Sequence, residues 1–262
     1  MFRLFLVFAL LASVVMGQQT MVLTFTFSSG TPGLTKQEGS ICYNILSNRS
    51  DGYNGTVVRP VTGLQYTDGT ETEIGVSVAP VVGQQALISK FLGDTTLFGD
   101  IFGDAVDNNV AGILDKSSTS PTALTLLGIQ KGQYTLSVLA ARGNVAEPNK
   151  PSTTYSLTLP DNVSAGKIEA RVLAYNGDAP VIEGATVTST IFGEGKIASN
   201  WALMQFSIVL EEDVEWLKLC ANGNHAHIAA VAFTAVPEPT SVVFSLLSVI
   251  WVAGYRRRKY SH

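Results

Sequence analysis

The chain has few cysteines, few charges and no long amphipathic helix. Its 262 residues include 2 cysteines, and 15% of the residues are charged. Two cysteines allow at most one disulfide bond. A helical period is visible only over the short stretch 84–91, so strands must supply the core of the fold.

Positive charge is scarce outside the ends of the chain. Of 17 Lys and Arg, five lie within residues 1–17 and 236–262, where one of the 21 Asp and Glu also lies. The body between these ends therefore carries a net charge of about −8, against −4 for the whole chain. An acidic body without a basic stripe argues against nucleic acid as a partner.

Catalytic motifs are absent from the sequence. It contains no Gly-x-Ser-x-Gly elbow, no His-Glu-x-x-His and no glycine-rich phosphate loop. Carboxylates gather at Glu211, Glu212, Asp213 and Glu215, but a glycosidase needs two of them several Å apart across a cleft. We therefore expect a non-enzymatic protein, with a secreted hydrolase acting on polysaccharide or ester substrates as the alternative.

The N-terminus has the composition of an export signal. Arg3 supplies a basic start, residues 4–16 are almost entirely apolar, and Gly17 offers a cleavage site before Gln18. A buried first strand is the alternative. We expect residues 1–17 to be a signal peptide that is absent from the folded protein.

The C-terminus combines a rigid motif, a short apolar run and a basic stop. Pro237-Glu238-Pro239 precedes the apolar residues 242–254, and Arg256, Arg257 and Arg258 follow. The apolar run has about 13 residues, whereas a stable membrane span needs roughly 20. Such a segment suits a transient anchor whose basic end stays on the cytoplasmic side.

This tail resembles the PEP-CTERM sorting signal of exported bacterial proteins. The resemblance implies processing by an exosortase-type membrane protease, transient anchoring by the C-terminal segment, and delivery to the cell surface or extracellular matrix. It covers residues 236–262 alone. An ordinary C-terminal membrane helix is the alternative interpretation.

Residues 18–235 read as many short strands, and we expect one all-β domain. Apolar and polar residues alternate, as expected for sheets with one buried face, over 22–27, 73–78, 133–138, 153–159, 167–173, 185–191, 205–210, 215–220 and 225–233. Turn sequences separate these runs, among them Asp68-Gly69 and Asn176-Gly177-Asp178. This pattern predicts an antiparallel β-sandwich; two stacked immunoglobulin-like units, joined over 146–151, are the alternative.

The segment 123–136 has the layout of a tyrosine corner. A strand, a turn containing Gly128 and Gly132, and then Tyr134 at the start of the next strand follow one another. We expect the Tyr134 hydroxyl to bind upstream backbone. With Cys42-Tyr43-Asn44 and the final strand, this segment resembles secreted jelly-roll domains of the galactose-binding or malectin-like type. Fibronectin-type sandwiches share the corner.

Cys42 and Cys220 lie near the two ends of the body. Because export leads to an oxidising compartment, one disulfide between them is permitted, and closing so long a loop would stabilise the fold by roughly 4–5 kcal/mol. Two buried free thiols are the alternative, since the sequence does not give the distance between the cysteines.

Candidate ligand sites are few. Asp100, Asp104, Asp107 and Asn108 lie in an acidic stretch that we expect to be a loop, either solvated or holding a structural calcium ion; no other cofactor is expected. Tyr53 and Tyr66, in turn-rich loops, are candidates for stacking on extracellular polysaccharide. Trp216 is expected in the core, and His225 and His227 on a strand surface.

Overall fold

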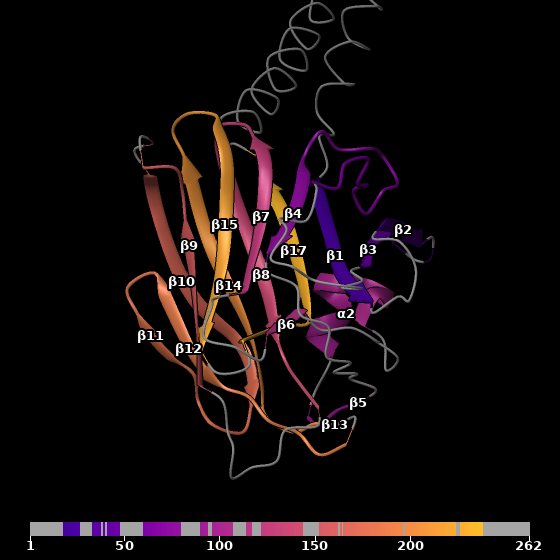
Figure 1. The fold of residues 1–262 in the computed structure, drawn as a ribbon, viewed down its shortest axis with the longest axis vertical. Coiled ribbons are helices and arrows are strands. Elements are labelled where there is room, and N and C mark those ends of the chain that lie inside the picture. The colour runs from indigo at the N-terminus through magenta and orange to yellow at the C-terminus, as the bar shows by residue number, and fades with distance from the viewer. Residues whose placement is uncertain are drawn as a thin grey trace, which may run out of the picture.

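The structure is a computed structural model that describes residues 18–26, 33–37, 39, 41–47, 60–79, 90–93, 96–106, 114–116, 122–143, 152–161, 163, 165–195, 197–223 and 226–237. These residues form two β-sheets packed face to face (Figure 1). The expected signal peptide and nearly all of the tail lie outside the described residues, as does most of the short helix expected over 84–91.

The larger sheet, sheet A, has seven strands in the order β10-β14-β8-β17-β1-β3-β2. All of its neighbouring strands are antiparallel except β1 and β3, which run parallel. Its strands are β1 (Thr20–Thr26), β2 (Gly33–Gln37), β3 (Tyr43–Ser47), β8 (Gly132–Ala140), β10 (Ala165–Asn176), β14 (Trp201–Leu210) and β17 (Ala230–Val236).

Sheet B has six antiparallel strands in the order β11-β12-β9-β15-β7-β4. They are β4 (Gly75–Ala79), β7 (Thr122–Ile129), β9 (Ser152–Thr158), β11 (Val181–Glu183), β12 (Thr186–Thr190) and β15 (Val214–Gly223). Two short pairs complete the fold: β5 (Lys90–Phe91) with β13 (Ile197–Ala198), and β6 (Leu114–Lys116) with β16 (Ala226–Ile228). An all-β sandwich, as expected from the alternating pattern, is confirmed.

The central core lies between the two sheets and is built by alternate residues of each strand. Met21, Leu23 and Phe25 of β1 are buried in it, as are Met204 and Phe206 of β14. Burying one such side chain stabilises the fold by about 1.5–3 kcal/mol. The alternation of apolar and polar residues in the sequence therefore marks which residues of each strand lie on the buried face and which lie on the other face.

A second core covers part of the other face of sheet A. It forms where α2 (Thr96–Phe102) and η1 (Gly103–Val106) pack on the sheet. Phe98 lies edge-to-face against Trp201, with ring centroids 4.8 Å apart, and against Phe91 at 5.0 Å. The Trp201 indole donates to the carbonyl of Leu92 at 2.7 Å.

The helix corrects the expectation of a loop in the acidic stretch. Residues 97, 98, 101 and 102 are all large and apolar, which is the i, i+1, i+4, i+5 spacing of a helix face. The two Gly-Asp pairs obscured this pattern. The acidic residues lie between apolar residues that pack against sheet A, so packing decides the local structure.

The tyrosine corner is confirmed. The Tyr134 hydroxyl donates to the carbonyl oxygen of Gln130 at 2.8 Å, as the chain passes from β7 in sheet B to β8 in sheet A. The Tyr134 ring stacks on Phe233 with centroids 4.8 Å apart. Burial raises the pKa of Tyr134 above its ordinary value of 10.0, and the charges of Tyr66 and Asp213 add to the rise.

Trp216 does not lie in the core, contrary to expectation. Leu126 and Ile129 of β7 are both buried, so the alternation shifts by one residue at Gly128, whose φ is 70°. Trp216, paired with Leu127, is therefore half-buried on the outer face of sheet B. The Lys218 ammonium lies 4.8 Å from the centre of the Trp216 ring.

We predict that replacing Tyr134 by Phe lowers the free energy of unfolding by about 0.5–1.5 kcal/mol, because the bond to Gln130 is lost while the ring stack remains. Folding raises the pKa of Tyr134, so its contribution is full below pH 10.0 and is lost as the pH rises through the folded pKa. Denaturant titrations at neutral and alkaline pH measure both effects. Tyr175→Phe, at a side chain that is 49% exposed, is the matched control. An alkaline loss that is equal in wild type and Tyr134→Phe would contradict the assignment.

Candidate functional site

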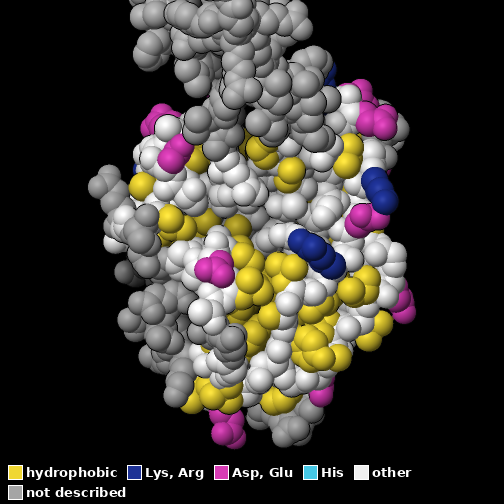
Figure 2. Space-filling model, turned by 180° about the vertical axis from the view of Figure 1, so that it is seen from behind, with side chains coloured by type: hydrophobic (Ala, Val, Ile, Leu, Met, Phe, Trp, Pro, Cys, Tyr) yellow, Lys and Arg dark blue, Asp and Glu magenta, His cyan; other side chains and the backbone are white. Residues whose placement is uncertain are grey.

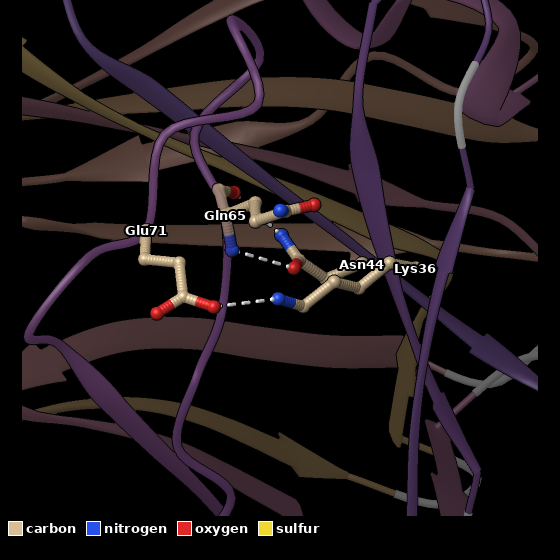
Figure 3. Close-up of polar contacts among 4 residues, drawn as sticks. All are labelled: Lys36, Asn44, Gln65 and Glu71. Carbon is tan, nitrogen blue, oxygen red and sulfur yellow. Dashed lines mark hydrogen bonds and ion pairs between the residues drawn. The ribbon is translucent and has the colours of Figure 1, made fainter.

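The loop that carries Tyr66, residues 60–74, is fixed to sheet A by one buried side chain. Asn44 of β3 is fully buried, and its amide donates to the carbonyls of Val22 at 3.0 Å and Gln65 at 2.8 Å. Its side-chain oxygen accepts from the Gln65 N–H at 2.8 Å (Figure 3). Asn44 therefore makes the two hydrogen bonds to the Gln65 backbone that a neighbouring strand would otherwise make, and it also satisfies the buried Val22 carbonyl.

Two further contacts hold the rim of this loop. Lys36 of β2 forms an ion pair with Glu71 at 3.2 Å, also drawn in Figure 3. At the predicted Asp68-Gly69 turn, the Asp68 carboxylate accepts from the hydroxyl of Thr70 at 2.6 Å and from its N–H at 2.9 Å. The hydroxyl bond, and then the N–H bond, lower the pKa of Asp68.

Tyr66 lies on the inner side of this loop. It is half-buried, its ring packs against the central core, and its hydroxyl accepts from the Thr72 hydroxyl at 3.1 Å. These contacts give Tyr66 a part in holding the loop on the sandwich. Tyr53, the other candidate for stacking on a sugar, lies outside the described residues.

The four candidate calcium ligands are only partly described. Asp100 is exposed on α2, and Asp104 lies in η1. Asp107 and Asn108 lie outside the described residues. In the described part of the chain, no three His, Cys, Asp or Glu side chains lie close enough together to hold a metal ion.

Cys42 and Cys220 are both free thiols in this structure, and both are half-buried, whereas the second alternative expected them to be buried. Cys42 lies next to the 60–74 loop, where its N–H donates to the Thr67 carbonyl at 2.9 Å. Cys220 belongs to β15 of sheet B and pairs with Ser156 and Ala123. It alternates with the buried Leu219 and Ala221, so its side chain lies on the outer face of sheet B, away from sheet A.

A buried polar cluster that the sequence did not indicate lies beyond the end of β8. His227, expected on a surface, is fully buried on β16, and Arg142 is 5% exposed. The Arg142 guanidinium lies 3.2 Å from the imidazole Nε2. Since a guanidinium can only donate, Nε2 must accept. The Tyr155 hydroxyl of β9 donates to the His227 carbonyl at 2.6 Å, so this cluster links β16 to sheet B. His225 lies outside the described residues.

More polar side chains are buried at the same end of the sandwich. Thr153 and Ser189 face each other in the register of β9 and β12, and Asn200 precedes β14. The Asn200 side chain accepts from the Asp178 N–H at 3.0 Å, which fixes the predicted turn at Gly177. The Thr153 and Ser189 hydroxyls have no hydrogen-bond partner within the part of the chain that the structure covers. Thr153 and Ser189 occupy core-facing positions of their strands, and these two polar residues were the sequence signal for buried polar groups at this end.

The first and last described residues lie together at the opposite end. Thr20 is the register partner of Thr234, their hydroxyl oxygens are 3.0 Å apart, and the Ala235 N–H donates to the Gln19 carbonyl at 2.9 Å. Gln18 and Pro237 are both exposed. The points at which the expected signal peptide and the expected tail join the domain are therefore side by side.

Comparison of the chain with protein-family models, curated proteins and solved structures gives no match. The helices within the described ranges are too short or too polar to cross a membrane.

An open groove of about 600 Å³ runs beside β10. Five consecutive residues of β10, from Lys167 to Arg171, line it, together with Gly184, Ala185 and Ser207. Figure 2 shows the molecule from behind, where exposed apolar side chains gather between a few charged ones. The groove lies where the edge strands of the two sheets, β10 and β11, come together, on the left in Figure 1.

We predict that Asn44→Ala lowers the free energy of unfolding by roughly 2–4 kcal/mol, because three hydrogen bonds to buried and part-buried backbone groups are lost together. Denaturant unfolding of the full chain measures the change. Asn222→Ala, at an exposed position of β15, is the control and should change stability by less than about 0.5 kcal/mol. An effect of Asn44→Ala no larger than that of the control would show that the 60–74 loop does not depend on Asn44.

Proposed function

We propose that this chain is an exported, non-enzymatic β-sandwich protein that is sorted by its C-terminal tail to the cell surface or extracellular matrix, where it associates with polysaccharide. Its localisation would be set by two terminal targeting segments, residues 1–17 and residues 236–262. An exosortase-type membrane protease would be the processing partner, and the C-terminal segment would hold the chain in the membrane until cleavage.

The observation that carries this proposal is the position of the two chain ends. Both targeting segments join the domain at one end of sheet A, close to Gln19 and Ala235. The Ala235 N–H donates to the Gln19 carbonyl at 2.9 Å. Two segments that must meet the same membrane, one during export and one before cleavage, are thereby brought to the same place. The last described strand, β17, ends at Val236 and so includes the first residue of the expected tail; cleavage at or after Pro237 would leave every described strand intact.

The connections between the sheets support the jelly-roll likeness, which is part of the proposal. From β7 to β10 the chain passes between the sheets at each connection, and it does so again from β14 through β15 to β17. Such alternation is the arrangement of Greek-key and jelly-roll sandwiches. In these folds the sandwich is a rigid support and the loops carry the binding residues.

Polysaccharide is the proposed partner because the sequence places Tyr53 in a turn-rich stretch directly before the 60–74 loop, which Asn44 fixes to sheet A. A fixed loop loses little conformational entropy when it binds a ligand. Tyr53 is the stacking residue of this proposal. Tyr66 supports the loop through its contacts with Thr72 and the core.

We predict that the triple change Pro237→Ala, Glu238→Ala and Pro239→Ala prevents removal of the tail. In a bacterial host that carries an exosortase-type protease, the wild-type chain should lose the mass of the tail and leave the membrane fraction. The triple variant should keep its full mass and stay with the membrane. Glu212→Ala, in an exposed turn next to β14, is the control and should be processed like wild type. Wild-type protein found in the cytosol with both ends intact would overturn the proposal.

We predict that Tyr53→Ala weakens retention of the full chain on its polysaccharide at least about tenfold, as expected for loss of an anchoring aromatic ring. Affinity electrophoresis in gels containing matrix polysaccharides from the host measures it. Tyr175→Ala, which removes an exposed tyrosine ring from β10, is the control and should leave retention unchanged. Equal losses in the two variants, or no retention of wild type by any polysaccharide, would contradict this part of the proposal.

A further inference from the structure

The outer edge of β10 pairs with no described strand and borders an open groove. The middle of this strand pairs regularly with β14 on its other side. β10 is the outermost strand of sheet A and has β14 as its neighbour there. Its pairing with β14 is irregular between Ala165 and Ile168 and again between Val172 and Ala174. Between these two places, residues Ile168 to Val172 form an unbroken five-residue stretch whose outer edge pairs with no strand among the described residues, and this edge can add a further strand.

The five-residue stretch is self-complementary. It reads Ile-Glu-Ala-Arg-Val, so an antiparallel copy centred on Ala170 places Glu169 opposite Arg171 of the second copy, and Arg171 opposite its Glu169. The same register places Ile168 opposite Val172. Every pair is then either acid with base or apolar with apolar, which is the pairing that stabilises neighbouring strands.

Charge disfavours two of the other antiparallel registers. A copy centred on Glu169 would place the two Glu169 side chains opposite each other and Lys167 opposite Arg171. A copy centred on Arg171 would place two guanidinium groups opposite each other. Like charges directly opposite each other destabilise a strand pair. A copy centred on Ile168 would pair Lys167 with Glu169, but half of it would fall on the irregular stretch between Ala165 and Ile168. Charge and the irregular pairing at both ends of the stretch together favour the register centred on Ala170.

The surroundings of β10 leave room for a second copy. The groove of about 600 Å³ lies along this stretch, and the residues across it, Gly184 and Ala185, are small. A Cβ atom added at Gly184 would meet nothing within 4 Å. Large apolar side chains are exposed nearby: Tyr175 is 49% exposed, and Val181 and Ile182 of the edge strand β11 are 56% and 45% exposed. Burying them against a second copy would add hydrophobic stabilisation.

We propose that this chain forms a two-fold symmetric dimer through antiparallel pairing of β10 with β10 of a second copy, centred on Ala170. The two A sheets then continue as one sheet, and each Glu169 pairs with the other copy's Arg171. This dimer goes beyond the proposed function and does not depend on it.

Charge substitutions test the register directly. In Glu169→Arg both cross-strand pairs become Arg with Arg, and in Arg171→Glu both become Glu with Glu. Each change should weaken the dimer by about 10- to 100-fold. Both residues are exposed in the single copy, where Glu169 pairs with Lys167 and Arg171 donates to Gln205, so the changes remove these surface contacts but leave the core intact. The double variant Glu169→Arg with Arg171→Glu exchanges the two charges, restores both pairs and should dimerise like wild type.

Mixing the two single variants provides a second rescue. A copy with two arginines and a copy with two glutamates pair favourably in this register, so an equimolar mixture should form a heterodimer where each variant alone is monomeric. Sedimentation velocity of the full chain in density-matched detergent, at low and high salt, measures all of these states. Dimerisation of the wild type should weaken at high salt.

Three results would overturn the proposal. A wild-type chain that stays monomeric at concentrations of about 100 µM has no dimer of useful affinity. A dimer that both single variants form as tightly as wild type uses another face. Failure of both the double variant and the mixture to regain the dimer, while circular dichroism shows each variant folded, would rule out the Glu169–Arg171 pair.

Discussion

The pairing of the first described strand with the last is the constraint on which the rest of the structure depends. β1 and β17 lie next to each other in the middle of sheet A, in register from Thr20 with Thr234 to Thr24 with Ala230. Contacts across more than two hundred residues must form before sheet A is complete, as with the bond between Thr20 and Thr234, which are 214 positions apart. Such long-range pairing is slow, so the domain folds only when its whole length is available.

This central position also explains why sheet A is apolar on both faces. Alternate residues of β1 contribute to different cores: Leu23 packs between the sheets, and Val22 packs beneath α2. β17 divides in the same way, with Val231 and Phe233 on the inner face and Ala230 and Ala232 on the other. Small alanines on the outer side let α2 approach the sheet, and Phe98 and Trp201 fill the space between them.

The sequence was informative where one rule decided the structure and uninformative where several competed. Alternation located most strands, and the spacing of Gly128, Gly132 and Tyr134 located the corner, because both are local patterns. α2 was missed because its apolar residues need sheet A to become a helix face, and a single sequence does not show that surface. His227 and Arg142 were missed for the same reason: their burial depends on β16, β8 and β9 meeting at one end. The cysteines are apart because Cys42 lies before β3, beside the 60–74 loop, while Cys220 faces outward from sheet B, and spacing along the chain reveals neither position.

Taken together, the geometry of the chain ends and that of the proposed dimer set an order of events. A two-fold axis through Ala170, perpendicular to sheet A, reverses the direction of every strand in the second copy. The end of sheet A that carries Gln19 and Ala235 then points one way in one copy and the opposite way in the other. Two copies held by their tails in one membrane cannot both satisfy this arrangement. Under the proposed sorting, pairing through β10 would therefore follow removal of the tail, which would both free the protein from the membrane and permit its assembly.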